Sequence, residues 1–245
     1  CSIVVSEYFY LLIFVLMAIK HLFFDLDHTL WDFNKNSKET LSELFDELSL
    51  SDKITSFTAF YDMYIEINEE LWDLYRKDQI TKADLRSVRF KRALKCFGID
   101  DEALAIELGD KYIQRCPLKG NLFADCHSVL ERLQSKYILH IITNGFEEVQ
   151  EVKMSSCNLN DYFTEIITSE GAGVRKPNPR IFEYAFDTSG AKPSESVMIG
   201  DSIEVDCIAA EKMGMQAVFF NPEKKLENKK VSYEIAHLKE LLEIF

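Results

Sequence analysis

Two aspartates, Asp25 and Asp27, stand one residue apart directly after the run His21 to Phe24, which is typical of a buried parallel strand. Like charges at the end of an apolar strand repel each other and resist desolvation. A divalent cation together with an anionic ligand would relieve that repulsion. The pair therefore favours a metal-assisted attack on phosphate. Taken alone it is a weak signal, because acidic pairs also cap helices and occupy turns.

Three further segments have the same build, in which an apolar run ends in a polar cluster that opens a helix-like stretch. The first, Tyr137 to Gly145, ends in Thr-Asn-Gly. The second is Lys176 to Pro179, and the third is Val197 to Ser202 with Asp206 following. Strands that alternate with helices imply right-handed crossovers and a parallel sheet.

In order and type, these four segments resemble the signature motifs of the haloacid dehalogenase superfamily of phosphotransferases. The likeness covers nearly everything from about Ile19 onward, and four motifs in order are far more specific than one. The resemblance implies an α/β fold, a doubly wound parallel sheet with a Rossmann-like core, whose motifs gather at the carboxyl ends of the strands. It also implies an inserted α-helical cap that closes over the substrate, excludes water and sets specificity.

The resemblance assigns roles to the acidic residues. Asp25 would be the nucleophile that forms an aspartyl-phosphate, and Asp27 the general acid and then the general base. Mg²⁺ would bind the Asp25 carboxylate, the backbone carbonyl of Asp27 and the Asp201 carboxylate. Ser202 and Asp206 would orient Asp201 or a catalytic lysine.

The resemblance also assigns groups that would stabilise the transferring phosphoryl group. Lys176 would supply positive charge. The Thr143 hydroxyl and the backbone N–H groups around Asn144 and Gly145 would bind the remaining phosphoryl oxygens at the start of the next helix. Because Asp27 is present, a phosphomonoesterase is favoured over dehalogenating or phosphonate-cleaving members, with a phosphomutase as the nearest alternative.

Each polar cluster also has a simpler interpretation. Asn144-Gly145 could form a hairpin turn, although residues 146 to 154 continue as a helix-like stretch. Asp201 could serve in a helix N-cap, which is compatible with metal binding. Lys176 could be a solvated surface lysine, although two prolines close behind it constrain the backbone.

The expected organisation divides the chain into three parts. Residues 17–33 and 118–245 would form the α/β core, and residues 34–117 the helical cap. The apolar run from Tyr8 to Ile19 is shorter than the roughly 20 residues of a membrane helix, and no Lys or Arg precedes it. We therefore expect residues 1–16 to be a non-native upstream extension, with Met17 as the initiator. A membrane anchor is the alternative.

Helical spacing and turn residues predict the elements of both parts. In residues 34–117, Thr81 with Asp84 predicts a capping box, Asp100 or Asp101 a further helix start, and Pro117 a helix end. In the core we expect the strands 138–142, 164–168, 196–200 and 216–220. We expect the helices 127–135, 146–156, 179–188 and 203–213, with a closing helix over 233–245.

Composition restricts the partners. The chain has 245 residues and a net charge of −13, which argues against nucleic-acid polymers, whose backbones need a basic face. A small phosphorylated metabolite remains compatible, because metal and lysine reverse the field locally. Six scattered cysteines without a zinc-like cluster indicate reduced thiols in a cytoplasmic protein. We expect no membrane partner, and a monomer or weak homodimer.

The ester is less well defined by the sequence. The stretch Leu71 to Tyr75, the pair Arg89-Phe90 and the Thr-Asn-Gly-Phe motif are similar to the house-cleaning nucleoside 5′-monophosphatases of the YjjG type. Pyrimidine or non-canonical nucleotides are therefore the expected substrates. Trp72 or Tyr75 could stack on a base, but aromatics at helical spacing are more often core residues. A sugar-phosphate or phosphoglycolate phosphatase, a beta-phosphoglucomutase-like enzyme and a non-catalytic binder of phosphorylated ligands stay open.

Overall fold

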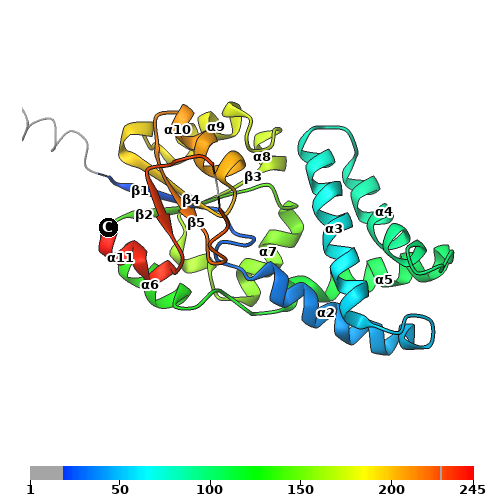
Figure 1. The fold of residues 1–245 in the computed structure, drawn as a ribbon. Helices are drawn as coiled ribbons and strands as arrows, with labels where there is room; N and C mark the ends of the chain where they lie inside the picture. Colours follow the sequence, from blue (N-terminus) through cyan, green and yellow to red (C-terminus); the bar gives the residue numbers. More distant parts are fainter. Residues whose placement is uncertain (1–18, 227) are drawn as a thin grey trace, which may run out of the picture. The chain divides into compact units, whose positions relative to one another are not determined.

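Six parallel strands form one sheet in the order β3-β2-β1-β4-β5-β6 (Figure 1). All neighbouring strands of the sheet run parallel to each other. Phe23 in the central strand lies opposite His140 on one side and Met198 on the other. The sheet confirms the predicted doubly wound α/β class. The strands are β1 (His21–Phe24), β2 (Ile138–Thr143), β3 (Glu165–Thr168), β4 (Ser196–Gly200), β5 (Gln216–Phe220) and β6 (Tyr233–Ile235).

Helices cover both faces of this sheet. In Figure 1, α9 (Pro179–Ser189) and α10 (Ala209–Lys212) lie on one face, and α6 (Cys126–Gln134) and α11 (Leu241–Ile244) on the other. The four residues of β1 are all buried, because this central strand has a neighbour on each side and helices on both faces. Burying a phenylalanine side chain such as Phe23 contributes roughly 2 to 3 kcal/mol.

One expectation for the carboxyl-terminal part was wrong. Residues 233–245 do not form one closing helix, because Tyr233–Ile235 pairs with β5 as a sixth strand and only Leu241–Ile244 is α-helical. The edge of β5 would otherwise leave backbone groups unpaired, and the short strand satisfies them. The predicted helix 203–213 is present, and its first part, Ile203–Ile208, is a π-helix that runs directly into α10.

The protein was analysed as a computed structural model that describes residues 19–226 and 228–245. It contains two compact units. The first holds the described residues up to Asp32 together with Leu122–Glu148 and Asn158–Phe245, and the second holds Phe33–Asn121 and Val149–Cys157. The proposed upstream extension, residues 1–16, and Met17 lie outside the described residues. Among the described helices, none combines the length and the apolar character that a membrane crossing requires.

Four long helices build the second unit, which we call the helical unit. They are α2 (Phe33–Glu47), α3 (Phe57–Arg76), α4 (Lys82–Lys95) and α5 (Glu102–Arg115). Thr81 and Asp84 form the predicted capping box at the start of α4. Asp101 caps α5 by accepting a hydrogen bond from Leu104 N, and Pro117 follows the end of that helix. α7 (Glu147–Ser156) spans the boundary between the two units in the sequence.

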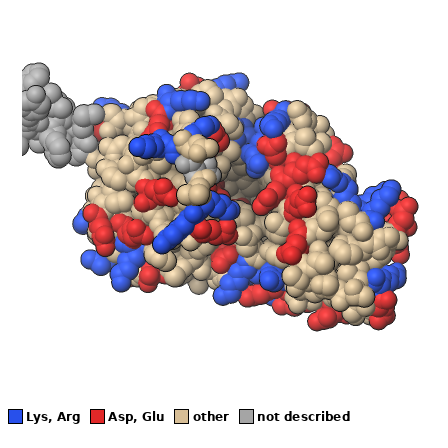
Figure 2. Space-filling model, in the orientation of Figure 1, with Lys and Arg blue, Asp and Glu red and all other residues tan. Residues whose placement is uncertain are grey.

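Aromatic rings fill the interior of the helical unit. Tyr64 stacks on Phe90 at 5.1 Å between ring centroids, and Tyr112 lies 5.3 Å from Phe90. The buried Arg89 places its guanidinium 5.0 Å from the centre of the Tyr112 ring, a cation–π arrangement. On the face drawn in Figure 2, acidic and basic side chains are interspersed over the surface.

A buried histidine pair makes the core sensitive to acid. His21 Nδ1 lies 3.0 Å from His140 Nε2, and both rings are buried, His21 at the start of β1 and His140 within β2. Burial, with a smaller contribution from His21, lowers the pKa of His140 to about 4. Burial also lowers the pKa of His21, against the opposing effect of Glu195. His140 is therefore neutral when folded but accepts a proton in the unfolded chain below about pH 6.5.

We predict that the free energy of unfolding falls by about 2 kcal/mol between pH 7.5 and pH 5 on account of His140. The sign follows from the lowered pKa: the unfolded state binds the extra proton, so stability is lost as the pH decreases from 6.5 towards 4. Urea unfolding of the wild type and of His140→Val at both pH values checks this, because the variant should lose that part of the pH dependence. An equal pH dependence in both proteins would contradict the assignment.

Candidate active site

The carboxyl ends of the central strands bring the predicted site residues together. Asp25 directly follows β1, Thr143 ends β2, and Asp201 directly follows β4. The strand order reverses between β1 and β4, and open α/β sheets bind ligands in the crevice at such a switch point. All of these residues lie within the first unit.

Lys176 is the centre of the site. Its Nζ donates to Asp25 Oδ1 at 2.7 Å, to Asp206 Oδ1 at 2.6 Å and to the carbonyl oxygen of Ile142 at 2.6 Å. The side chain is only 1% exposed. It is therefore not a solvated surface lysine, and all three of its ammonium hydrogens have acceptors.

The charges at this site perturb one another strongly. Burial raises the pKa of Asp25 well above its usual range, Lys176 lowers it, and Asp206 and Asp201 raise it further. Burial alone would lower the pKa of Lys176, but the Asp206 and Asp25 carboxylates raise it above its ordinary value. Two buried carboxylates, those of Asp25 and Asp206, thus share one ammonium group beside the half-buried Asp201, and one further cation would relieve the remaining repulsion.

Asp201 lies beside two residues of the loop after β1. Thr29 Oγ1 donates to Asp201 Oδ1 at 3.5 Å, and the Thr29 side chain is fully buried. Burial raises the pKa of Asp201 to about 7, and Asp206 and Asp27 contribute to the increase. Thr29 had no role in the sequence interpretation. Its spacing, two residues after Asp27, is the signal that could have identified it.

The π-helix after β4 positions Asp206. Cys207 N donates to the Ser202 carbonyl at 3.3 Å, five residues back, which widens the first turn. Asp206 Oδ2 accepts from Ser202 N at 3.1 Å while Oδ1 accepts from Lys176. Ser202 Oγ accepts from Val205 N and caps the turn. Ser202 and Asp206 therefore lie next to Asp201 and Lys176.

Gly200 lies in close contact with Asp206. A Cβ atom at position 200 would lie 2.5 Å from Cγ and 2.6 Å from Cβ of Asp206. We therefore predict that Gly200→Ala displaces Asp206 from Lys176, lowers kcat by about 10- to 100-fold and reduces the free energy of unfolding by about 1 to 3 kcal/mol. Steady-state kinetics and urea unfolding measure both effects.

Gly120→Ala is the matched control for this prediction, because a Cβ at position 120 meets nothing within 4 Å. It should leave kcat and stability close to wild type. Unchanged activity in Gly200→Ala would contradict the role of close packing at Asp206.

The loop after β2 is held by hydrogen bonds of its own. Thr143 Oγ1 accepts from Gly145 N at 3.0 Å. The Asn144 side chain bonds the backbone of Lys176 twice, with Nδ2 donating to the carbonyl at 2.9 Å and Oδ1 accepting from N–H at 2.8 Å. Residues 146–156 continue into α7 and not into a second strand, so the alternative of a hairpin turn at Asn144-Gly145 was wrong.

The acidic residues fit a hard divalent cation. Asp25, Asp201 and Asp206 each offer one oxygen, and these atoms lie within 4.8 Å of one another. Oxygen ligands and crowded negative charge are what Mg²⁺ requires. Both carboxylate oxygens of Asp206 already accept hydrogen bonds, one from Lys176 and the other from Ser202. The carboxylates of Asp25 and Asp201 are therefore better suited to direct ligation of the metal.

Comparison with known proteins identifies the family. The family model described as haloacid dehalogenase-like hydrolase matches residues 19–214, which is more than half of the chain. The chain belongs to this family. It is therefore an enzyme of the haloacid dehalogenase-like hydrolases, as the order of its four motifs predicted.

Several relatives of this hydrolase cover most of its length. Pyrimidine 5′-nucleotidase PynA of Streptococcus pneumoniae is 29% identical over 93% of this chain and 95% of the relative. Pyrimidine 5′-nucleotidase YjjG of Escherichia coli is 32% identical over 82% of this chain and 85% of the relative. The magnesium-bound structure of the putative hydrolase YfnB from Bacillus subtilis superposes with a TM-score of 0.83, at 27% identity, covering 93% of this chain and 98% of that one.

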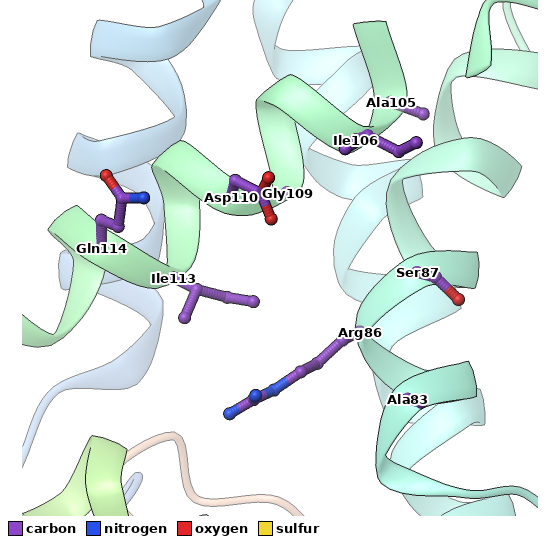
Figure 3. A pocket seen from close by; sticks show the side chains of 9 residues that line it. All are labelled: Ala83, Arg86, Ser87, Ala105, Ile106, Gly109, Asp110, Ile113 and Gln114. Atoms are coloured by element: carbon purple, nitrogen blue, oxygen red, sulfur yellow. The ribbon is translucent and has the colours of Figure 1, made fainter. Parts of the chain in front are cut away.

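The helical unit of this hydrolase contains a pocket of its own, of about 320 Å³, between α4 and α5 (Figure 3). The Arg86 side chain extends into it from α4, and Asp110 and Gln114 belong to α5. Ile106 and Ile113 supply apolar surface. The pocket combines hydrogen-bond donors and acceptors with apolar walls, at the lower end of the volumes typical of small-molecule sites.

Proposed function

We propose that this hydrolase cleaves phosphomonoesters with Mg²⁺ through an aspartyl-phosphate on Asp25, and that its substrates are nucleoside 5′-monophosphates. The observation that carries the proposal is the contact of the Lys176 ammonium with Asp25, next to Asp201 and Asp206. An anionic nucleophile can approach an anionic ester only where positive charge is fixed in advance.

The reaction has two steps. In the first, an Asp25 carboxylate oxygen bonds to phosphorus while the bond from phosphorus to the ester oxygen breaks, and Asp27 donates a proton to that leaving oxygen. In the second, Asp27 removes a proton from water, whose oxygen attacks the phosphorus and releases inorganic phosphate and free Asp25. Lys176 stabilises the negative charge in both steps, and Thr143 with the loop at Asn144 and Gly145 binds phosphoryl oxygens.

Asp25, the backbone carbonyl of Asp27 and Asp201 would hold the Mg²⁺, and Thr29 and Asp206 would orient the site. When bound, the ion supplies positive charge that offsets the repulsion between nucleophile and ester. Thr29 donates to Asp201 and so keeps that carboxylate facing the site.

Nucleotides are the favoured esters because two relatives that cover most of the chain are named pyrimidine 5′-nucleotidases.

A sugar-phosphate phosphatase is the second candidate. It is supported by the glyceraldehyde 3-phosphate phosphatase of Methanothermobacter thermautotrophicus, which is 31% identical over 84% of this chain and 87% of the relative. The alternative of a phosphomutase predicts isomerisation of a sugar 1-phosphate to the 6-phosphate without net release of phosphate.

A panel of phosphate esters with Mg²⁺ and with EDTA tests the proposal. We expect dUMP and dTMP to be hydrolysed with the highest kcat/KM and EDTA to abolish the activity. A strong preference for a hexose phosphate, glyceraldehyde 3-phosphate or phosphoglycolate would contradict the nucleotide assignment. Full activity in EDTA would contradict the metal.

A further inference from the structure

The backbone of Lys176 is held by a single side chain. Lys176 lies in the turn between α8 (Ser169–Ala172) and α9, outside any helix or strand. Its N–H and its carbonyl both bond the side chain of Asn144, at 2.8 and 2.9 Å. Secondary structure does not fix the position of this buried residue, so the Asn144 amide does.

Only a primary amide can make this pair of bonds. An amide presents one acceptor and one donor side by side, which match the N–H and the carbonyl of one residue. An aspartate at position 144 would lose the donor and an alanine would lose both. The two bonds also fix the orientation of the amide, because exchanging its O and N atoms would face oxygen against carbonyl oxygen.

Residues at the end of β2 thus contact Lys176 at two points, its side-chain ammonium group and its backbone. The Ile142 carbonyl accepts from Nζ at 2.6 Å, and Asn144, two residues later, binds the backbone. A lysine side chain has a flexible four-carbon stem, and it loses considerable rotamer entropy when its ammonium group is fixed. Anchoring its backbone to the same strand shortens the range over which Nζ can move relative to Asp25.

We infer that Asn144 is a positioning residue for Lys176, through its side-chain amide, in addition to any contact of its backbone with phosphate. This inference rests on the proposed function, in which Lys176 stabilises the transferring phosphoryl group. Removing the Asn144 amide should lower kcat much more than it raises KM, because Lys176 would still be present but would no longer be held next to Asp25.

A double-mutant cycle tests the inference. On the best substrate of the ester panel, we expect Asn144→Ala to lower kcat by about 30-fold with KM changed less than about threefold. In the Lys176→Met background, adding Asn144→Ala should change kcat by less than about twofold, since there is no ammonium left to position. Asn144→Asp keeps the shape of the side chain and loses one bond, so it should also lower kcat.

Asn178→Ala is the matched control. It removes the same residue type two positions from Lys176, where the Asn178 side chain caps α9 by accepting from Arg180 N at 3.0 Å. Loss of that cap should reduce stability by about 1 kcal/mol and leave kcat close to wild type. This control distinguishes a general loosening of the turn before α9 from a displacement of Lys176.

Two results would overturn the inference. One is full kcat in folded Asn144→Ala and Asn144→Asp while Lys176→Met is inactive. The other is a loss from Asn144→Ala that is equally large with and without Lys176, which would mean that Asn144 acts on another group. Failure of the proposed function looks different, because wild-type protein would then release no phosphate from any ester of the panel.

Discussion

Asp25→Asn is expected to lower kcat by at least about 10,000-fold while the protein remains folded. Asparagine has the shape of aspartate but lacks the anionic oxygen that attacks phosphorus. Its amide can still accept a hydrogen bond from Lys176, whose Nζ lies 2.7 Å from Asp25 Oδ1 in the wild type. Phosphate release under saturating substrate and Mg²⁺, with circular dichroism on the same samples, measures both parts of the prediction.

Asp125→Asn is the control for this variant. Asp125 is exposed and precedes α6 without a side-chain capping bond, so the same chemical change there should leave activity unaltered. Residual turnover above about 1% of wild type in pure Asp25→Asn would be incompatible with a nucleophilic role for Asp25.

Lys176→Met is expected to reduce both activity and stability. The methionine fills much of the volume of the lysine but removes the ammonium that contacts Asp25 and Asp206. Loss of a preorganised positive group should lower kcat by about 1,000-fold. Two buried carboxylates would lose their counter-charge, which should lower the free energy of unfolding by about 3 to 5 kcal/mol.

Kinetics and urea unfolding of Lys176→Met measure these effects, with the exposed Lys192→Met as the control. A stability loss without a loss of kcat would assign Lys176 to structure alone. A loss of kcat without any stability loss would mean that the ion pairs with Asp25 and Asp206 contribute little to folding.

The core of the site could be predicted because its residues are marked by local patterns. Asp25, Thr143 and Asp201 each follow an apolar run, and parallel strands place the ends of such runs on one edge of a sheet. The sequence also predicted the parallel sheet and the capping box at Thr81. These features depend on neighbours within a few residues, where hydrophobic spacing and turn chemistry decide the structure.

The features that sequence reasoning missed depend on distant contacts or on short segments. The fit of Gly200 against Asp206 and the bond from Thr29 to Asp201 arise only when the loops have folded. Strand β6 has three residues, too few for an alternating pattern to distinguish it from the helix expected there. The π-helix has no sequence signal that helical periodicity could reveal.

The Asn144 side chain has a bonding partner that the sequence could not identify. Its position after β2 suggested a contact with phosphate, and its two bonds to Lys176 join residues that are 32 positions apart. A pattern of residue types can place an amide at the end of a strand. The partner that the amide selects depends on where the turn before α9 lies in three dimensions.

The most direct test of the account is detection of a phosphoenzyme on Asp25. Rapid quenching of wild-type protein with dUMP and Mg²⁺, followed by peptide mass spectrometry, should find phosphate on the peptide that carries Asp25, and none in Asp25→Asn. Rapid turnover without a phosphorylated peptide, or with phosphate on another residue, would contradict nucleophilic catalysis by Asp25.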